Sequence, residues 1–172
     1  KAPTSLRSNG IEPVALRADD DSPESIADAV LRAVGLAEPD GLTAVVVPDH
    51  LHDPIDAALA PDRFTLPDRE PPRVYTVRSC KGLEFDTTIV VEPAAIIDQS
   101  PRGLSDLYVA LTRATQRLVV VHRDDLPDAL GWALPRASMR GGVPGSAGLG
   151  GEGTMTLQRA WAPYPKFKQF SF

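Results

Sequence analysis

Three short runs of apolar residues and threonine, mostly β-branched and without a charge, constrain the fold of this chain more than any other feature. They occupy residues 42–47, 87–91 and 118–121. Strands that are apolar at every position are buried on both faces, as in parallel sheets that helices cover on both sides. Two further short strands are predicted at residues 13–17 and 74–77.

Helical patterns alternate with these strands. A helix is predicted over residues 22–35, where Ser22 is an N-cap and Pro23 occupies the first helical position. Three more helices are predicted, from residue 53, over residues 103 to about 116, and from residue 125. This alternation predicts an α/β fold with a mostly parallel sheet flanked by helices. Such sheets bind ligands at the carboxyl ends of their strands.

Composition excludes several classes of protein. No stretch approaches the roughly 20 apolar residues of a membrane span, and the single cysteine, Cys80, excludes a disulfide framework. We therefore expect a cytoplasmic protein without a metal site, since the three histidines are scattered. The net charge is −5, but residues 1–72 carry 6 basic and 14 acidic side chains, whereas residues 73–123 carry 7 and 5. An anion would therefore be held in the middle of the chain.

The chain divides into three parts by composition. A folded domain is predicted over residues 1–135, a glycine-rich linker over 136–153 and a basic aromatic tail over 154–172. The tail could stack on bases, dock on a folded domain, or be a non-native extension. Its aromatic residues are Trp161, Tyr164, Phe167, Phe170 and Phe172.

The first segment whose side chains could bind a ligand is the polar turn between the strands predicted at 74–77 and 87–91. Arg78 and Lys81 offer cationic donors, and Glu84 offers an acceptor suited to hydroxyl groups. Gly82 permits a positive φ or the close approach of a ligand to the backbone. The alternative interpretation is a charged β-hairpin with a surface ion-pair network.

The second segment covers residues 106–118. Arg113 and Arg117 are four residues apart, so the predicted helix would place them on one face. A helical arginine near a strand end can bind a phosphate bidentately. The alternative is a solvated amphipathic helix.

These segments resemble two motifs of superfamily 1 helicases of the UvrD/Rep type. The sequence KGLEFD at 81–86, followed by an apolar strand, resembles motif V. The sequence YVALTRA at 108–114, followed by QRL at 116–118 and a strand, resembles motif VI. The resemblance covers residues 73–123 well and residues 1–72 only in strand–helix layout. It implies the second RecA-like motor domain of such a helicase.

The resemblance also implies roles for individual residues. Arg113 matches the motif VI arginine that reaches the γ-phosphate of ATP across an inter-domain cleft, as an arginine finger. Glu84 matches a residue that contacts the nucleotide ribose, and Gly82 belongs to the same ATP-binding turn. The residues implied to face nucleic acid are Thr76, Arg78, Ser79 and Lys81. The family usually has histidine at or near Arg78, so this chain departs from the pattern there.

A finer resemblance connects the chain with the HelD branch, whose UvrD-like ATPases act on bacterial RNA polymerase. It depends on residues 5–10, on residues 100–105, and on the short segment from Glu92 to Ser105 between the two motifs. Three functions follow as alternatives: an ATP-dependent DNA helicase or translocase, a motor that displaces or recycles RNA polymerase, and a degenerate protein-binding RecA-like module.

The sequence has no G-x-x-x-x-G-K-[ST] phosphate loop and no matching acidic Walker B pair. The resemblance therefore implies that ATP and Mg²⁺ are bound mainly by a first RecA-like motor domain outside this sequence. We expect this chain alone to hold no cofactor and to be inactive as an ATPase. Its expected partners are that first domain and either single-stranded DNA or RNA polymerase.

Overall fold

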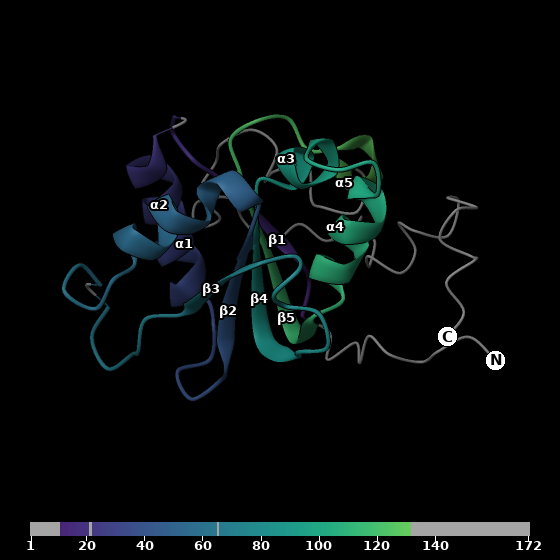
Figure 1. Ribbon diagram of the computed structural model, residues 1–172. Coiled ribbons are helices and arrows are strands. Elements are labelled where there is room, and N and C mark those ends of the chain that lie inside the picture. The colour runs from purple at the N-terminus through teal and green to yellow at the C-terminus, as the bar shows by residue number, and fades with distance from the viewer. Residues whose placement is uncertain (1–10, 21, 65, 132–172) are drawn as a thin grey trace, which may run out of the picture.

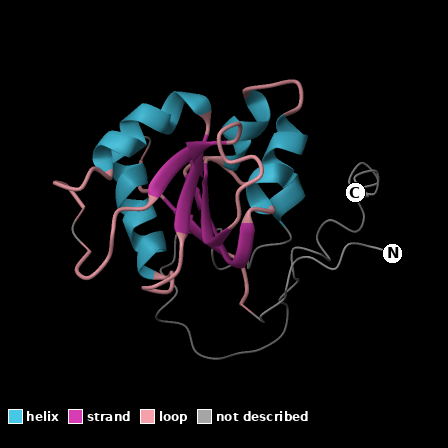
Figure 2. Cartoon of the chain, turned by 60° about the horizontal axis from the view of Figure 1, so that its bottom comes forward, coloured by secondary structure: helices cyan, strands magenta, loops and turns pink. Residues whose placement is uncertain are grey.

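The computed structural model describes residues 11–20, 22–64 and 66–131 as a five-stranded, all-parallel sheet with helices on both faces (Figures 1 and 2). The strand order is β1-β5-β4-β2-β3. The strands are β1 (Val14–Arg17), β2 (Thr43–Val47), β3 (Arg73–Thr76), β4 (Phe85–Val91) and β5 (Ala114–His122). The helices are α1 (Pro23–Gly35), the 3₁₀ turn Asp49–Leu51, α2 (His52–Ala58), α3 (Pro93–Asp98), α4 (Gly103–Leu111) and α5 (Asp128–Gly131).

Burial explains why the central strands are apolar at every position. Alternate residues of β2, such as Val45 and Val46, are fully buried in two different cores. One core lies under α1 and α2, and the other lies under α3, α4 and α5, as the two groups of helices in Figure 1 indicate. The predicted α/β fold with a mostly parallel sheet flanked by helices is therefore confirmed.

The helix predicted over residues 103–116 is too long. α4 ends at Leu111, where the Thr112 hydroxyl donates to the carbonyl oxygens of Tyr108 (3.0 Å) and Val109 (3.1 Å). The strand β5 begins only three residues later, because Ala114 pairs with Phe85 of β4. β-pairing therefore overrides helical spacing at residues 114–116.

This correction changes the environment of the two arginines. Arg113 lies in the turn between α4 and β5, and Arg117 lies within β5. They do not share a helix face. The segment from Glu92 to Ser105, predicted as a short connection, contains α3 and the start of α4.

Glu92 turns the chain sharply from β4 into α3. It adopts a left-handed conformation, with φ of 47°, and its N–H donates to the Val121 carbonyl. Its carboxylate accepts the N–H of Arg123, and burial raises the pKa of this carboxyl above its usual value. A buried polar residue with both backbone and side-chain partners thus fixes where β4 ends.

Two predicted regions cannot be compared with the structure. The glycine-rich segment 136–153 and the tail 154–172 lie outside the described residues, as do residues 1–10 and 132–135 of the predicted domain. In the part that the structure describes, no helix is both long and apolar enough to cross a bilayer. No group of three or more His, Cys, Asp or Glu side chains there is arranged to hold a metal ion.

The helices α3 and α4 meet at Gly103, the first residue of α4. A Cβ at this position would lie 1.8 Å from the Ile97 carbonyl oxygen, which is a backbone atom that cannot move aside cheaply. Gly35, at the end of α1, has no atom within 4 Å of the corresponding point.

We predict that Gly103→Ala destabilises the chain by about 3 kcal/mol or more, because overpacking against backbone forces the two helices apart. Gly35→Ala is the matched control and should be neutral, or stabilising by up to about 1 kcal/mol. Urea unfolding of both variants measures the difference. Equal midpoints for the two variants would contradict the close packing of α3 on α4.

Candidate functional site

The connection between β3 and β4 runs along the sheet from one edge to the other, past β2. The two strands are parallel and separated by β2, so residues 77–84 run from the carboxyl edge of the sheet to its amino edge. A β-hairpin at this place is therefore excluded. The aromatic rings of Tyr75 and Phe85, at the two ends of the crossing, pack with their centroids 5.2 Å apart.

The crossing begins with a reciprocal pair of hydroxyl caps. The Ser79 hydroxyl oxygen accepts the Thr76 N–H at 2.9 Å, and the Thr76 hydroxyl oxygen accepts the Ser79 N–H at 3.3 Å. This is the pattern of a capping box, with both side chains returned to the backbone. Thr76 and Ser79, both predicted to face nucleic acid, therefore shape the turn that carries their neighbours.

The turn has a buried side and an exposed side. Val77 and Cys80 are buried in the core beneath α3 and α4, and burial raises the pKa of the Cys80 thiol. Arg78 and Lys81 are exposed. Neither of these two cations has a hydrogen-bond or ion-pair partner among the described residues, so their charges face outward.

The turn ends with the other motif V residues. Gly82 has φ of +81°, a backbone conformation that favours glycine. Glu84 is exposed, and its carboxylate has no partner among the described residues. Glu84 directly precedes β4, so it lies at the amino edge of the sheet.

Arg113 lies against this turn. Its Nη1 donates to the Leu83 carbonyl at 3.1 Å, its Nε donates to the Val109 carbonyl at 3.1 Å, and its Nη2 donates to the Thr112 hydroxyl at 3.3 Å. The guanidinium is half-buried and forms no ion pair with a carboxylate of the described segments. The guanidinium has more N–H donors than these contacts use, so it can also donate to an anionic ligand.

Four hydrogen bonds join the segments 83–86 and 113–116. Besides the Arg113–Leu83 contact, the Phe85 N–H donates to the Arg113 carbonyl at 2.9 Å. The Thr115 hydroxyl donates to the Phe85 carbonyl at 3.1 Å, and Gln116 Nε2 donates to the Asp86 carboxylate at 2.7 Å. The two sequence motifs are thus one structural unit. Sequence reasoning gave no role to Asp86, Thr115 or Gln116.

The predicted site residues lie at opposite edges of the sheet. Thr76 and the cations that follow it come after the carboxyl end of β3, where a parallel sheet is expected to bind ligands. Glu84 and Arg113 directly precede β4 and β5, so they lie at the amino edge. These two residues therefore do not lie at the carboxyl edge, where the general rule places a ligand.

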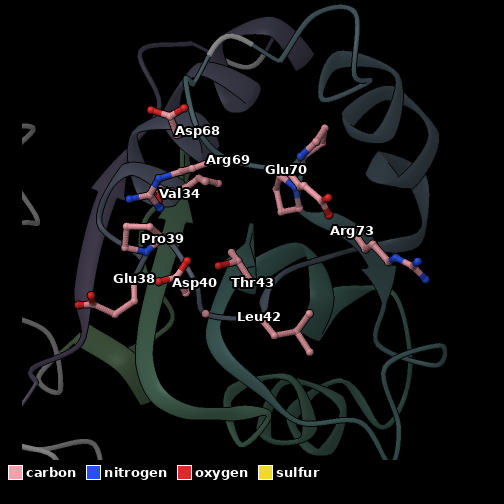
Figure 3. Close-up of a pocket in the computed structure, with 13 residues that line it drawn as sticks. Val34, Glu38, Pro39, Asp40, Leu42, Thr43, Asp68, Arg69, Glu70 and Arg73 are labelled. Carbon is pink, nitrogen blue, oxygen red and sulfur yellow. The ribbon is translucent and has the colours of Figure 1, made fainter.

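A pocket of about 390 Å³ lies at the amino ends of β2 and β3 (Figure 3). It contains none of the predicted site residues. Its charged lining residues are Glu38, Asp40, Asp68, Arg69, Glu70 and Arg73. Arg69 lies beside Val34 and donates to its carbonyl at 2.7 Å. The pocket is connected to the two motifs through Leu42, whose N–H donates to the Asp86 carboxylate at 2.8 Å.

The all-parallel α/β sheet carries the two motifs as one hydrogen-bonded unit. Residues 72–121, from the start of β3 almost to the end of β5, match the family of UvrD-like helicase C-terminal domains. Among solved structures, the C-terminal domain of a possible DNA helicase from Lactobacillus plantarum WCFS1 is similar, with 21% identity and a TM-score of 0.45. That similarity covers 66% of this chain and 73% of the other. No curated protein matches the chain.

Proposed function

We propose that this chain is the C-terminal motor domain of a UvrD-like ATP-dependent DNA helicase or translocase. One observation carries the proposal: the Arg113 guanidinium is held on the carbonyl that immediately precedes the exposed Glu84, without a carboxylate partner among the described residues. A fixed, half-exposed cation beside a free carboxylate suits a ligand with both phosphate and hydroxyl groups.

The proposed role of Arg113 is to stabilise negative charge on the transferring phosphoryl group. A guanidinium stays charged at every relevant pH, and its contacts to Val109 and Leu83 orient it before a nucleotide arrives. The Glu84 carboxylate would accept hydrogen bonds from the ribose hydroxyl groups. Gly82, with its positive φ, allows the turn that precedes Glu84.

The other end of the crossing is the proposed nucleic-acid contact. Arg78 and Lys81 present outward charges on a turn that the Thr76–Ser79 caps hold in shape. Arg113 bonds to the Leu83 carbonyl, which lies in the same short segment as Arg78 and Lys81. A movement of Arg113 would therefore be transmitted along the backbone to the proposed nucleic-acid contact. A nucleic-acid contact whose position changes with the state of the bound nucleotide is the kind of two-state element that a motor needs.

We predict that this chain alone does not turn over ATP, because it has no phosphate loop to hold ATP and Mg²⁺. These groups would be held mainly by a first motor domain, as the partner in the proposed cleft. Phosphate release from the purified chain in the presence of ATP, Mg²⁺ and single-stranded DNA measures this. Turnover above the buffer blank would contradict the division of the active site between two domains.

In a protein that contains both motor domains, we predict that Arg113→Ala lowers ATP turnover by about 10³-fold or more, the usual effect of an arginine finger. Arg113→Lys should recover little of it, since an ammonium cannot reproduce the guanidinium contacts. Arg63→Ala, at an exposed arginine after α2, is the control. Turnover equal to that of the unmodified protein, with the urea midpoint unchanged, would refute the role of Arg113.

We predict that Arg78→Ala and Lys81→Ala each reduce the salt dependence of single-stranded DNA binding in the same two-domain protein. Each lost phosphate contact should lower the slope of log K against log salt by about 0.7. Titration of a fluorescent oligothymidine at several salt concentrations measures the slope, with Arg63→Ala as control. Unchanged slopes would exclude the DNA contact, and binding to RNA polymerase instead would favour a motor that displaces that enzyme.

A further inference from the structure

We infer that Asp86 is a positioning residue that holds Arg113 in place through the strand β5. The inference rests on the function proposed above for Arg113. Asp86 itself does not belong to the proposed ATP or nucleic-acid contacts, and its role follows from the hydrogen bonds of its carboxylate.

The Asp86 carboxylate joins three segments that are distant in the sequence. Oδ2 accepts the N–H of Leu42, at the start of β2, at 2.8 Å. Oδ1 accepts Nε2 of Gln116, within β5, at 2.7 Å. Asp86 itself lies in β4, immediately after the turn that contains Glu84. Each carboxylate oxygen therefore has its own donor, one from the residue just before β2 and one from β5, the two strands that flank β4.

This bridge lies at an irregularity in the β4–β5 pairing. Phe85 is opposite Ala114, but Thr87 is opposite Arg117, so two residues of β5 face the single residue Asp86. A bulge of this kind leaves the ladder locally incomplete. The side chains of the two bulged residues supply the missing connections, because Thr115 bonds to Phe85 and Gln116 bonds to Asp86.

The bulge directly follows Arg113. The Arg113 carbonyl accepts the Phe85 N–H, so the backbone position of Arg113 depends on how β5 is seated on β4. Without the Asp86–Gln116 bond, the bulged residues lose a side-chain hydrogen bond to Asp86, and the start of β5 can slip. Asp86 would therefore set the position from which the guanidinium reaches its ligand.

Gly41 supports this interpretation from the other side. A Cβ at Gly41 would come within 3.3 Å of the Asp86 Cβ and 3.4 Å of the Glu38 carbonyl oxygen, both tight contacts. The loop before β2 thus approaches Asp86 closely, and it thereby delivers the Leu42 N–H to the carboxylate. The same loop lines the pocket of Figure 3, so that wall of the pocket is tied to the two motifs.

The chemistry of the bridge allows a reciprocal exchange as a test. Gln116→Glu places a second carboxylate against Asp86 and removes the donor, which introduces repulsion. Adding Asp86→Asn restores both bonds with the direction of one reversed, since an amide offers an oxygen to Leu42 and an N–H to the new carboxylate. The double variant keeps the net charge of the unmodified chain.

Amide hydrogen exchange on this chain tests the positioning. Gln116→Glu should accelerate exchange of the Phe85 and Leu42 amides by about tenfold or more, the equivalent of about 1.4 kcal/mol. The Ala18 amide, which bonds to the His122 carbonyl at the opposite edge, should not change. In the double variant, both exchange rates should return to within about twofold of those in the unmodified chain. Asp62→Asn, at an exposed residue, is the charge control.

Three results of this exchange experiment would overturn the inference: no acceleration, an equal acceleration at Ala18, or no recovery in the double variant. A uniform acceleration would mean that Asp86 only contributes to global stability.

ATP turnover in a two-domain protein separates this inference from the proposed function. Gln116→Glu should lower kcat with little change in KM, and the double variant should restore kcat. If Arg113→Ala abolishes turnover while Gln116→Glu leaves it unchanged, the positioning role fails and the proposed function stands. If Arg113→Ala has no effect, the proposed function fails, whatever the exchange rates show.

Discussion

The pairing of β4 with β5 is the interaction on which the rest of this domain depends. It is the longest contact in the sheet, and it joins segments that come from two separate stretches of sequence. The backbone bond from Phe85 to Arg113 and the guanidinium bond from Arg113 to Leu83 lie at its first residues. A shift of one residue in this register would move Arg113 away from the turn and reverse the face of every following side chain.

The parallel sheet also explains why residues 77–84 present cations near one edge of the sheet and a carboxylate at the other. In a parallel sheet, a chain that leaves the carboxyl end of one strand must return to the amino end of the next. The crossing from β3 to β4 does this over residues 77–84, anchored underneath by Val77 and Cys80. Its outward cations therefore lie toward one edge of the sheet and Glu84 lies at the other. The short crossing is thus a direct covalent link between the two edges of the sheet.

Local stereochemistry accounts for both the successes and the errors of prediction from sequence. The apolar runs at 42–47, 87–91 and 118–121 all became central strands, because only double-sided burial accommodates such runs in a protein of this size. The Ser22 cap also formed as predicted, with the Ser25 N–H donated to its hydroxyl. The end of α4 was misplaced because alanine, threonine and glutamine at 114–116 suit a helix until pairing with β4 outweighs that preference.

The sequence alone determined the set of strands, the two motifs and the chemical types of their side chains. The reason is that apolar runs and turn-forming residues are patterns of consecutive positions in the chain. Only the tertiary structure decided that Glu84 and Arg113 share the amino edge, and that Thr76 and Ser79 cap each other's backbone N–H groups. It alone revealed the Asp86 bridge, whose partners Leu42 and Gln116 are 44 and 30 residues away in the chain. Such contacts depend on strand order and register, and these arise from the packing of the whole sheet and its helices.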